Sequence, residues 1–284
     1  NTEGGNNSAL GYQALSNNTT ASNNVAVGYN SLLSNTTGTE NTAVGANALD
    51  AATTADHNTA VGHNSLTTNT TGSENTAVGQ GSLGSNTTGA NNTALGYLAL
   101  VLNSTASNNT AVGYNSLATN TTGTENVSVG AFALDANTTG DTNTAVGYVA
   151  LSSNASGASN TAVGRAALFT NTASNNTAVG KEALKLNTSG ADNTAVGLSA
   201  LLVNTTGTQN TAVGANALDA NTTGQENTAV GYHSLGATTT GSSNTAVGHE
   251  CGTSNTTGQR NVAVGNTTLY YNTTGNDNTA VGRG

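Results

Sequence analysis

The chain has almost none of the residues on which several common protein classes depend. It contains no proline, methionine or tryptophan, a single cysteine, and only five Lys and Arg residues against 14 Asp and Glu. One cysteine cannot form an internal disulfide, so the sequence neither requires nor excludes an oxidising compartment. A formal net charge of −9 without a basic stripe argues against nucleic-acid binding. The apolar runs are too short to cross a membrane, so no membrane insertion is expected in this segment.

Glycine, by contrast, recurs with a fixed period along the whole chain. Almost every interval is 17 residues, as from Gly28 to Gly45, and one interval of 16 separates Gly164 from Gly180. The repeated unit reads N-T-A-V-G-x-x-A-L-x-x-N-T-T-G-x-x and fills one predicted domain, 1–284, of about 17 coils. Strict apolar columns argue against disorder in spite of the biased composition. A short fixed period predicts a stacked architecture rather than a globular enzyme.

Each unit is expected to form one coil of a β-solenoid. The segment T-A-V is short and β-branched, which is typical of a strand, whereas N-T-T-G is turn chemistry. We therefore expect two short strands and two turns per coil, with neighbouring coils paired in parallel at about 4.8 Å. The predicted fold class is an all-β parallel β-solenoid, a rod of about 80 Å. The 16-residue unit loses its residue in the turn 171–176, where a deletion does not flip the strand faces.

Two columns of larger apolar residues are expected to fill the core, namely the Val before the period glycine and the Leu four residues after it. They include Val44, Leu49, Val146, Leu151, Val213 and Leu218. Along a strand such as 41–45, alternation places Asn, Ala and Gly on one face and Thr and Val on the other. Neither face is charged, so one is expected inside the coil and the other against a partner chain. This pattern predicts self-association.

An Asn stands four residues before every period glycine. Such a column is expected to form a ladder in which each side-chain amide bonds the one above and the one below. The expected ladder comprises Asn24, Asn41, Asn58, Asn75, Asn92, Asn109, Asn126, Asn143, Asn160, Asn176, Asn193, Asn210, Asn227, Asn244 and Asn261.

The segment 41–49 resembles the head repeat of trimeric autotransporter adhesins of the YadA type, whose pattern is S-V-A-I-G-x-x-A/S. Ala43, Val44, Gly45 and Ala48 match it, as do the equivalent residues of nearly every coil. The unit also resembles the N-T-A-V-G repeats of bacterial tail-fibre-like proteins. The resemblance covers the whole chain but departs from the adhesin pattern by three extra residues per coil. It implies an intertwined or side-by-side homotrimer that serves as a stalk or adhesive head, without catalytic residues.

A longer repeat of five coils, about 85 residues, is superimposed on the short one. The sequence A-N-A-L-D occurs at 46–50 and 215–219, and A-F-A-L-D occurs at 131–135. Every fifth coil also carries a bulky pair before its turn, at 101–102, 185–186 and 270–271. Duplication of gene blocks explains this pattern, and a lateral contact recurring about every 24 Å is the functional alternative.

Few residues suggest a binding site. Cys251 follows His249 and Glu250 directly in the sequence and is expected to be a buried small residue rather than a metal ligand. Tyrosines recur at a tolerant position just after the period glycine, so they are expected to be exposed and able to contact a glycan or receptor. The possible contact residues are Tyr29, Tyr114, Tyr148, Tyr232, Tyr270 and Tyr271. Asn-x-Thr/Ser sequons in the turns, as at Asn35, are interpreted as turn chemistry and a stacked Asn column or, alternatively, as glycan acceptors.

These patterns favour a structural fibre segment that lies outside the cell, on a cell surface or in a phage-like particle. It would act as a stalk, adhesin or filament subunit, without cofactor or metal, and would form a homotrimer or polymerise end to end. The alternative is an ice-binding solenoid, because Thr columns at about 4.8 Å can order water. A solenoid polysaccharide lyase is disfavoured because the carboxylates form no paired column.

Overall fold

The structure, a computed structural model, describes residues 3–284 as strands and turns, with no helix among them. The chain divides into two compact units, Asn1–Thr142 and Asn143–Gly284. The first holds β1 (Ser8–Leu10), β2 (Val25–Val27), β3 (Thr42–Val44), β4 (Thr59–Val61), β5 (Thr76–Val78), β6 (Thr93–Leu95), β7 (Thr110–Val112) and β8 (Val127–Val129). The second holds β9 (Thr144–Val146), β10 (Thr161–Val163), β11 (Thr177–Val179), β12 (Thr194–Val196), β13 (Thr211–Val213), β14 (Thr228–Val230), β15 (Thr245–Val247), β16 (Val262–Val264) and β17 (Thr279–Val281).

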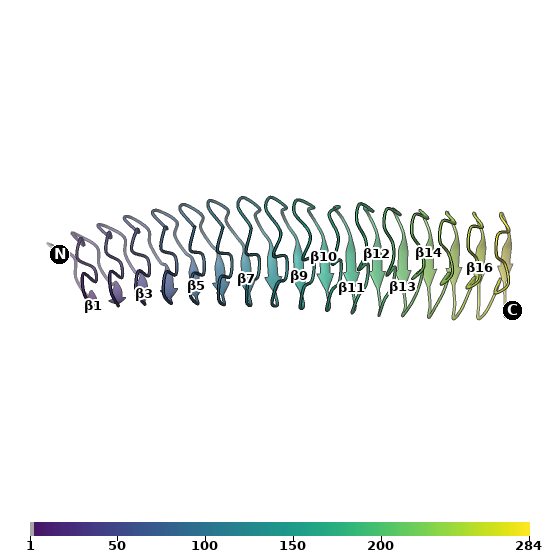
Figure 1. Cartoon of the computed structure of the whole chain (residues 1–284), viewed down its shortest axis with the longest axis horizontal. Coiled ribbons are helices and arrows are strands. Elements are labelled where there is room, and N and C mark those ends of the chain that lie inside the picture. The colour runs from purple at the N-terminus through teal and green to yellow at the C-terminus, as the bar shows by residue number, and fades with distance from the viewer. Residues whose placement is uncertain (1–2) are drawn as a thin grey trace. The chain divides into compact units, whose positions relative to one another are not determined.

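Within each unit, successive strands pair in parallel and in register (Figure 1). Thr42 lies opposite Thr59 in the first unit, and Thr194 lies opposite Thr211 in the second. The predicted all-β parallel β-solenoid with 17-residue coils is therefore confirmed. That residues 1–284 form a single repeat domain stays a prediction, and residues 1–2 lie outside the described part.

Each coil has one strand, so the prediction of two strands per coil is wrong. Counting the period glycine as position 0, residues at positions 2 and 4 adopt positive φ in coil after coil; Asn47 and Leu49 have φ of 55° and 51°. The backbone here bonds to both neighbouring coils. Asn47 N–H donates to the carbonyl of Tyr29 in the preceding coil, whereas Leu49 N–H donates to the carbonyl of Ser65 in the next. The backbone on this side is therefore hydrogen-bonded from coil to coil, although it does not form a β-strand.

The leucine at position 4 adopts a backbone conformation that is rare for bulky residues. Positive φ costs roughly 1–3 kcal/mol for a residue of this kind. Leu49 is completely buried, which contributes roughly 1.5–3 kcal/mol and offsets that strain. The one coil without a leucine here has Gly252, with φ of 61°, and glycine adopts this conformation without strain.

Position 0 requires glycine because neighbouring coils approach each other too closely there for a side chain. A Cβ on Gly62 would lie 2.5 Å from the carbonyl oxygen of Gly79, and the φ of Gly62 is 140°. Both the angle and the contact exclude other residues, which explains why the period is marked by glycine.

The interior of each coil is small and polar. Alanine at position −2 and leucine at position 4 are buried together with the asparagines at positions −4 and 7, as Ala43, Leu49, Asn41 and Asn35 show. The valines lie on the opposite face of the strand: Val44 and Val146 are half-buried and Val213 is 36% exposed. The expectation that these valines fill the core is therefore wrong. Leu49, Leu151 and Leu218 are fully buried, as expected.

Candidate functional site

The asparagines at position −4 bond from coil to coil in the interior. The backbone N–H of Asn41 donates to Asn24 Oδ1 at 2.9 Å, and Asn41 Nδ2 donates across the coil to the carbonyl of Ala55 at 2.7 Å. Asn58 Nδ2 also donates to Asn41 Oδ1 at 3.1 Å, so amides contact directly at many rungs. The same bonds recur at the other asparagines of the column, as from Asn210 to Asn193. The expected ladder thus includes backbone donors as well as side-chain amides.

A second asparagine ladder runs through position 7, the asparagine of the N-T-T-G turn. Asn86 Nδ2 donates to Asn69 Oδ1 at 2.8 Å and to the carbonyl of Gly89 at 2.8 Å. Asn92, the next residue at position −4, stands within the same interior, and Asn75 Nδ2 shares the Gly89 carbonyl at 2.9 Å. The two ladders therefore meet on one carbonyl in coils that carry asparagine at position 7.

These turn asparagines are also those of the N-glycosylation sequons, and their burial favours the interpretation as turn chemistry. The amide nitrogens are engaged and the side chains are inaccessible: Asn35, Asn69, Asn120, Asn137, Asn204 and Asn221 are fully buried and Asn255 is 2% exposed. An oligosaccharide could not be attached to these residues without opening the coil. They hold the coil together in the folded protein.

Asparagine is missing from position 7 at two places, and each gap leaves an unpaired oxygen in the coil before it. Ala52 and Thr238 stand where position 7 would carry asparagine. In the coils before them, Asn35 Oδ1 and Asn221 Oδ1 are buried without a hydrogen-bond partner. Each lacks the amide that the next rung would supply.

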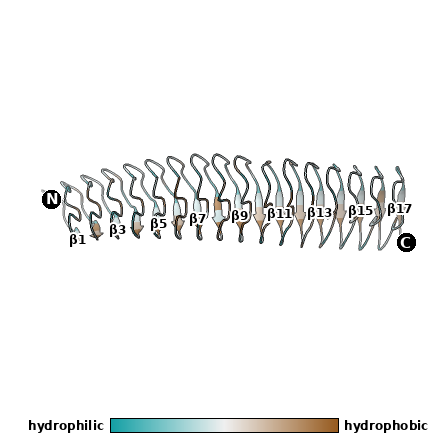
Figure 2. Cartoon of the chain, viewed as in Figure 1, coloured by the Kyte–Doolittle hydropathy of each residue, from teal (hydrophilic) through white to brown (hydrophobic). Residues whose placement is uncertain are grey.

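The outer face of the strands is uncharged in both units and carries an apolar column beside a column that is mostly Thr. Position −1 is Val or Leu and position −3 is Thr, Val or Ser in every coil. Val179, Val196 and Val247 are 37–38% exposed, and Leu95 is 47% exposed. Figure 2 shows the brown of hydrophobic residues along many of the strands. A continuous exposed apolar column is unusual on a monomeric soluble protein.

The tyrosines after the period glycine are exposed as expected, and four of them form two stacked pairs. Tyr12 stacks on Tyr29 with ring centroids 5.4 Å apart, and Tyr97 stacks on Tyr114 at 5.5 Å. Phe132 packs edge-on against Tyr114 at 5.1 Å. Tyr148 is 52% exposed, and Tyr232, 48% exposed, stacks on His249. Aromatic residues at the same position in successive coils therefore lie at stacking distance.

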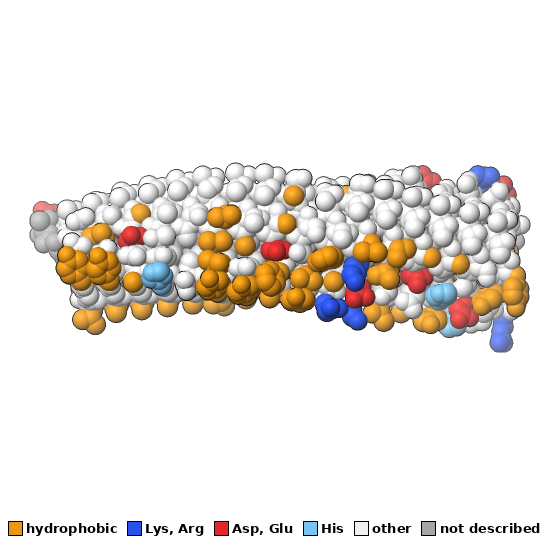
Figure 3. Space-filling model, viewed as in Figure 1, with side chains coloured by type: hydrophobic (Ala, Val, Ile, Leu, Met, Phe, Trp, Pro, Cys, Tyr) orange, Lys and Arg blue, Asp and Glu red, His pale blue; other side chains and the backbone are white. Residues whose placement is uncertain are grey.

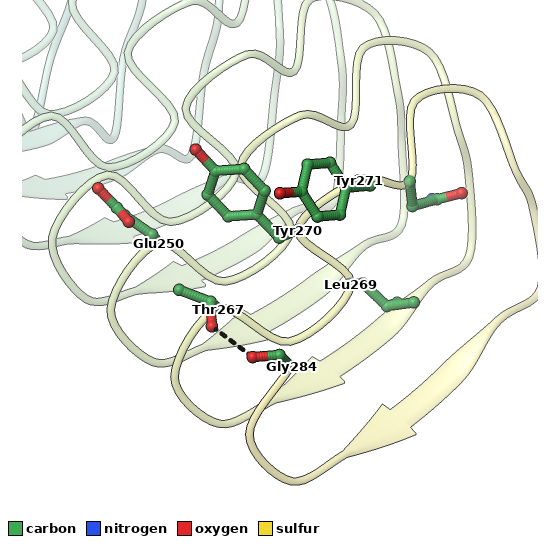
Figure 4. Close-up of a pocket in the computed structure, with 7 residues that line it drawn as sticks. Glu250, Thr267, Leu269, Tyr270, Tyr271 and Gly284 are labelled. Carbon is green, nitrogen blue, oxygen red and sulfur yellow. Dashed lines mark hydrogen bonds between the residues drawn. The ribbon is translucent and has the colours of Figure 1, made fainter.

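A hollow of about 570 Å³ lies beside Tyr270 and Tyr271, which Figure 4 shows together with Glu250, Thr267, Leu269 and Gly284. Tyr271 is 87% exposed. Leu269 and Asn272 belong to the interior columns, which the following coil covers elsewhere. The hollow is therefore the uncovered interior of the coil stack rather than a built ligand site.

Cys251 occupies position 3 and is completely buried. Its thiol donates to the carbonyl of Ala263 at 3.2 Å, and desolvation raises its pKa. His249 is exposed, and its Nδ1 lies 3.8 Å from Glu250 Oε2 on the outside of the coil. Cys251 is the buried small residue that the sequence predicts, and among residues 3–284 no cluster of three metal-ligating side chains occurs.

Basic residues gather at one place in the second unit, which sequence reasoning missed because Arg165 lies one coil before Lys181 and Lys185. Arg165 Nη1 lies 3.2 Å from Glu182 Oε1, and Lys185 Nζ lies 3.6 Å from the same atom. Lys181 is exposed in the same column as Arg165. Figure 3 shows blue Lys and Arg side chains beside a red acidic one on this face of the second unit. The 17-residue period would have revealed the cluster if the charges had been aligned by column.

Two further acidic residues have perturbed pKa values. Arg260 donates to both carboxylate oxygens of Asp277, at 2.6 and 3.0 Å, and this lowers the pKa of Asp277. Desolvation raises the pKa of Asp219, against the attraction of His233, and Asp219 Oδ1 has no hydrogen-bond partner. Neither carboxylate faces a second one, so the described residues offer no acid–base pair there.

Comparisons with protein-family models, with curated proteins and with solved structures give no match to this chain. Within the described residues, no helix has the length and apolar character needed to span a membrane.

Proposed function

We propose that the chain is a segment of a structural fibre outside the cell, a stalk, adhesin or filament unit that associates with copies of itself and carries out no catalysis. The observation that supports this most is the outer strand face. Its columns repeat Val and Thr in both units without one charged residue, although nothing inside the coil requires an apolar residue there. A solvated face would be expected to vary in polarity.

Self-association would remove these columns from water. Burying a half-exposed valine completely contributes roughly 1 kcal/mol, and each coil adds one such residue. Summed over many coils, this exceeds the cost of bringing chains together, about 4–15 kcal/mol. A homotrimer is the proposed stoichiometry, by the resemblance to adhesin head repeats, and end-to-end growth is the alternative assembly.

Substitutions at two adjacent residues of β9 test folding and assembly separately. Ala145 is fully buried and Val146 is half-buried on the outer face. Ala145→Asp should unfold its coil and the neighbouring ones, because an unpaired buried charge costs several kcal/mol. Val146→Asp, combined with Val196→Asp and Val247→Asp, should leave the circular dichroism spectrum unchanged and reduce the mass measured by sedimentation equilibrium. A wild-type monomer of 27.7 kDa with full β content would contradict the proposal.

A second candidate, ice binding, is favoured by one observation. Position 9 carries an exposed Thr in every coil of the first unit, for example Thr37, Thr54 and Thr71. The preceding Thr is not available to water in the same way, because Thr36 Oγ1 donates to the carbonyl of Thr53 at 3.0 Å. Of the two Thr columns in the turn, only the one at position 9 therefore offers its hydroxyls to water. A flat ice-binding surface would offer two such columns. Thermal hysteresis of the purified protein would support this candidate, and its absence would remove it.

A further inference from the structure

The basic cluster of the second unit borders a hollow with an apolar floor. The hollow has a volume of about 230 Å³ and is lined by Val149, Arg165, Ala166, Phe169 and Lys185. Ligand pockets for drug-sized molecules measure about 300–1,000 Å³, so this hollow suits a single small group. Phe169 and Val149 supply apolar surface, while Arg165 and Lys185 supply positive charge from successive coils.

The charge of the cluster is not balanced within the protein. Arg165 and Lys185 both contact one carboxylate, that of Glu182, and Lys181, the residue before Glu182, is exposed. Two of the five Lys and Arg residues in a chain of net charge −9 therefore line one hollow. The two cations share one carboxylate, so one positive charge is left unbalanced at the hollow, and screening limits the repulsion from distant acids beyond about 8–10 Å.

The position of Glu182 shows which anion the cluster fits. Its Oε1 lies 3.2 Å from Arg165 and 3.6 Å from Lys185, so the two cations already stand at the spacing that one carboxylate bridges. The guanidinium side chain of Arg165 is 58% exposed and can turn one edge to solvent while it holds Glu182. Arginine binds carboxylates through two parallel N–H donors.

The aromatic surface beside the cations indicates what carries the anion. Phe169 lies in the hollow, and Tyr148, 52% exposed, precedes Arg165 in the column of residues after the period glycine. Aromatic faces offer an apolar, weakly negative surface to the C–H face of a sugar ring. An acidic peptide needs the charge but not the ring surface. We propose that this hollow binds a carboxylated sugar, with the carboxylate on Arg165 and Lys185 and the ring on Phe169.

This inference names a ligand class for the proposed surface fibre and rests on that function only for its biological setting. All the residues involved belong to coils within 148–185, so binding does not depend on assembly. Measuring the oligomeric state in the same samples keeps the two proposals distinguishable. A monomer that binds would contradict the fibre alone, and a trimer that does not bind would contradict the sugar site alone.

The binding test uses three probes on the whole chain by isothermal titration calorimetry: tetragalacturonate, its methyl ester and a tetraglutamate peptide. Tetragalacturonate should bind, and the ester should bind about tenfold more weakly because it lacks the carboxylates. Tetraglutamate should also bind about tenfold more weakly because it has no sugar ring. Absence of tetragalacturonate binding would overturn the proposal. Equal binding of tetraglutamate would overturn it as well, and would indicate an acidic protein segment, including a second copy of this chain.

Matched variants locate the site. R165Q/K185Q should weaken tetragalacturonate binding about tenfold, whereas R260Q/R283Q, which removes the same charge elsewhere in the second unit, should change it less than about twofold. F169L should weaken binding about threefold while keeping an apolar floor. E182Q should strengthen binding about threefold, because the competing carboxylate is gone, and a merely structural role of Glu182 would not produce a gain. Equal losses in both double variants, or weaker binding by E182Q, would contradict the site.

Discussion

In the first unit, Asn75 N–H donates to Asn58 Oδ1 at 3.0 Å and Asn75 Nδ2 donates to the carbonyl of Gly89 at 2.9 Å. In the second unit, Asn210 makes the same two bonds, to Asn193 and to Gly224, at the same distances. The exteriors differ. The first unit has eight Asp and Glu residues and no Lys or Arg, whereas the second has six acidic residues and all five Lys and Arg.

This comparison shows which columns maintain the fold and which are free to carry function. Positions −4, −2, 0, 4 and 7 face the interior or the neighbouring coil, and they are nearly uniform across both units. Positions 1, 2 and 5 face outward and hold tyrosine pairs in one place and the basic cluster in another. If substitutions at equivalent interior residues of the two units changed the stability by different amounts, this interpretation would be wrong. The following substitutions test it.

The largest effect is expected at the buried leucines. Leu49→Asp in the first unit and Leu151→Asp in the second should each cost roughly 3–5 kcal/mol, because each places an unpaired charge in a coil interior. Tyr29→Ala and Tyr148→Ala, at the exposed column, should cost about 0.5 kcal/mol or somewhat more where a ring stacks. Urea unfolding of the four variants measures this. Comparable losses at leucine and tyrosine would contradict the assignment of columns.

The next effect concerns the asparagine ladder. Asn75→Ala and Asn210→Ala should each lose roughly 1–3 kcal/mol, because a buried carbonyl and a backbone N–H lose their partners. Asn17→Ala, at an exposed position, serves as the control. If Ala, Ser and Asp are tolerated equally at Asn75, the ladder does not hold the coil together. The equivalent residues of the two units should give equal losses.

A gain of stability is expected where the second ladder is broken. Ala52→Asn supplies Asn35 Oδ1 with an amide donor in the first unit, and Thr238→Asn does the same for Asn221 Oδ1 in the second. Each should stabilise by about 1 kcal/mol, the net value of one buried hydrogen bond. Differential scanning calorimetry should show a higher melting temperature for both. Asn35→Ala placed on the Ala52→Asn background should cancel the gain, and a gain that persists would have another cause.

The smallest effect is a pH dependence that distinguishes two aspartates at position 5. Asp50 Oδ1 accepts a bond from Thr67 Oγ1 at 2.7 Å, whereas the residue equivalent to Thr67 in the coil after Asp219 is Gly236. The pKa of Asp219 is raised by burial, so folding favours its protonated form. Its contribution to stability is full below its unfolded pKa, near 3.8, and is lost as pH rises through the folded pKa.

Asp219→Asn should therefore stabilise the protein at pH 7 by about 0.5 kcal/mol or less and leave it unchanged near pH 3, since the group is only half-buried. Asp50→Asn should show no such gain, because Asp50 already has its hydroxyl partner. Melting temperatures of both variants between pH 3 and pH 7 check this. An equal gain in Asp50→Asn would show that general surface charge, rather than the missing partner of Asp219, is responsible.

Much of the fold could be predicted from the 17-residue period, since the glycines, the strand segment T-A-V and the Asn column each have a simple physical interpretation. The second predicted strand failed because A-L reads as strand by composition, whereas Leu49 adopts positive φ only through contacts with the next coil. Val44 was assigned to the core on hydrophobicity alone. Alternation separated the two faces correctly but could not show that the smaller one, with Ala43, lies inside.

The candidate sites were less predictable, because they depend on which residues lie next to one another across coils. The tyrosines at position 1 were recognisable as exposed, but their stacking required the parallel register that places Tyr97 on Tyr114. The cluster of Arg165, Lys181 and Lys185 spans a shortened coil, which hides its alignment in the printed sequence. The register across that coil is nevertheless kept, since Thr161 pairs with Thr177.

Because the interior columns are uniform, the number of coils in the chain can also change in evolution. Any whole coil within a unit can be removed or duplicated, and the coils on either side then meet with the same glycine, leucine and two asparagines. The shortened unit shows where a change inside a coil is tolerated, since it lacks the exposed residue between Thr172 and Ala173. Asn187 Nδ2 still donates to Asn171 Oδ1, and Asn176 N–H still donates to Asn160 Oδ1. Recombination between near-identical gene segments can therefore lengthen or shorten the protein in steps of one coil, and the exterior columns can diversify afterwards without refolding.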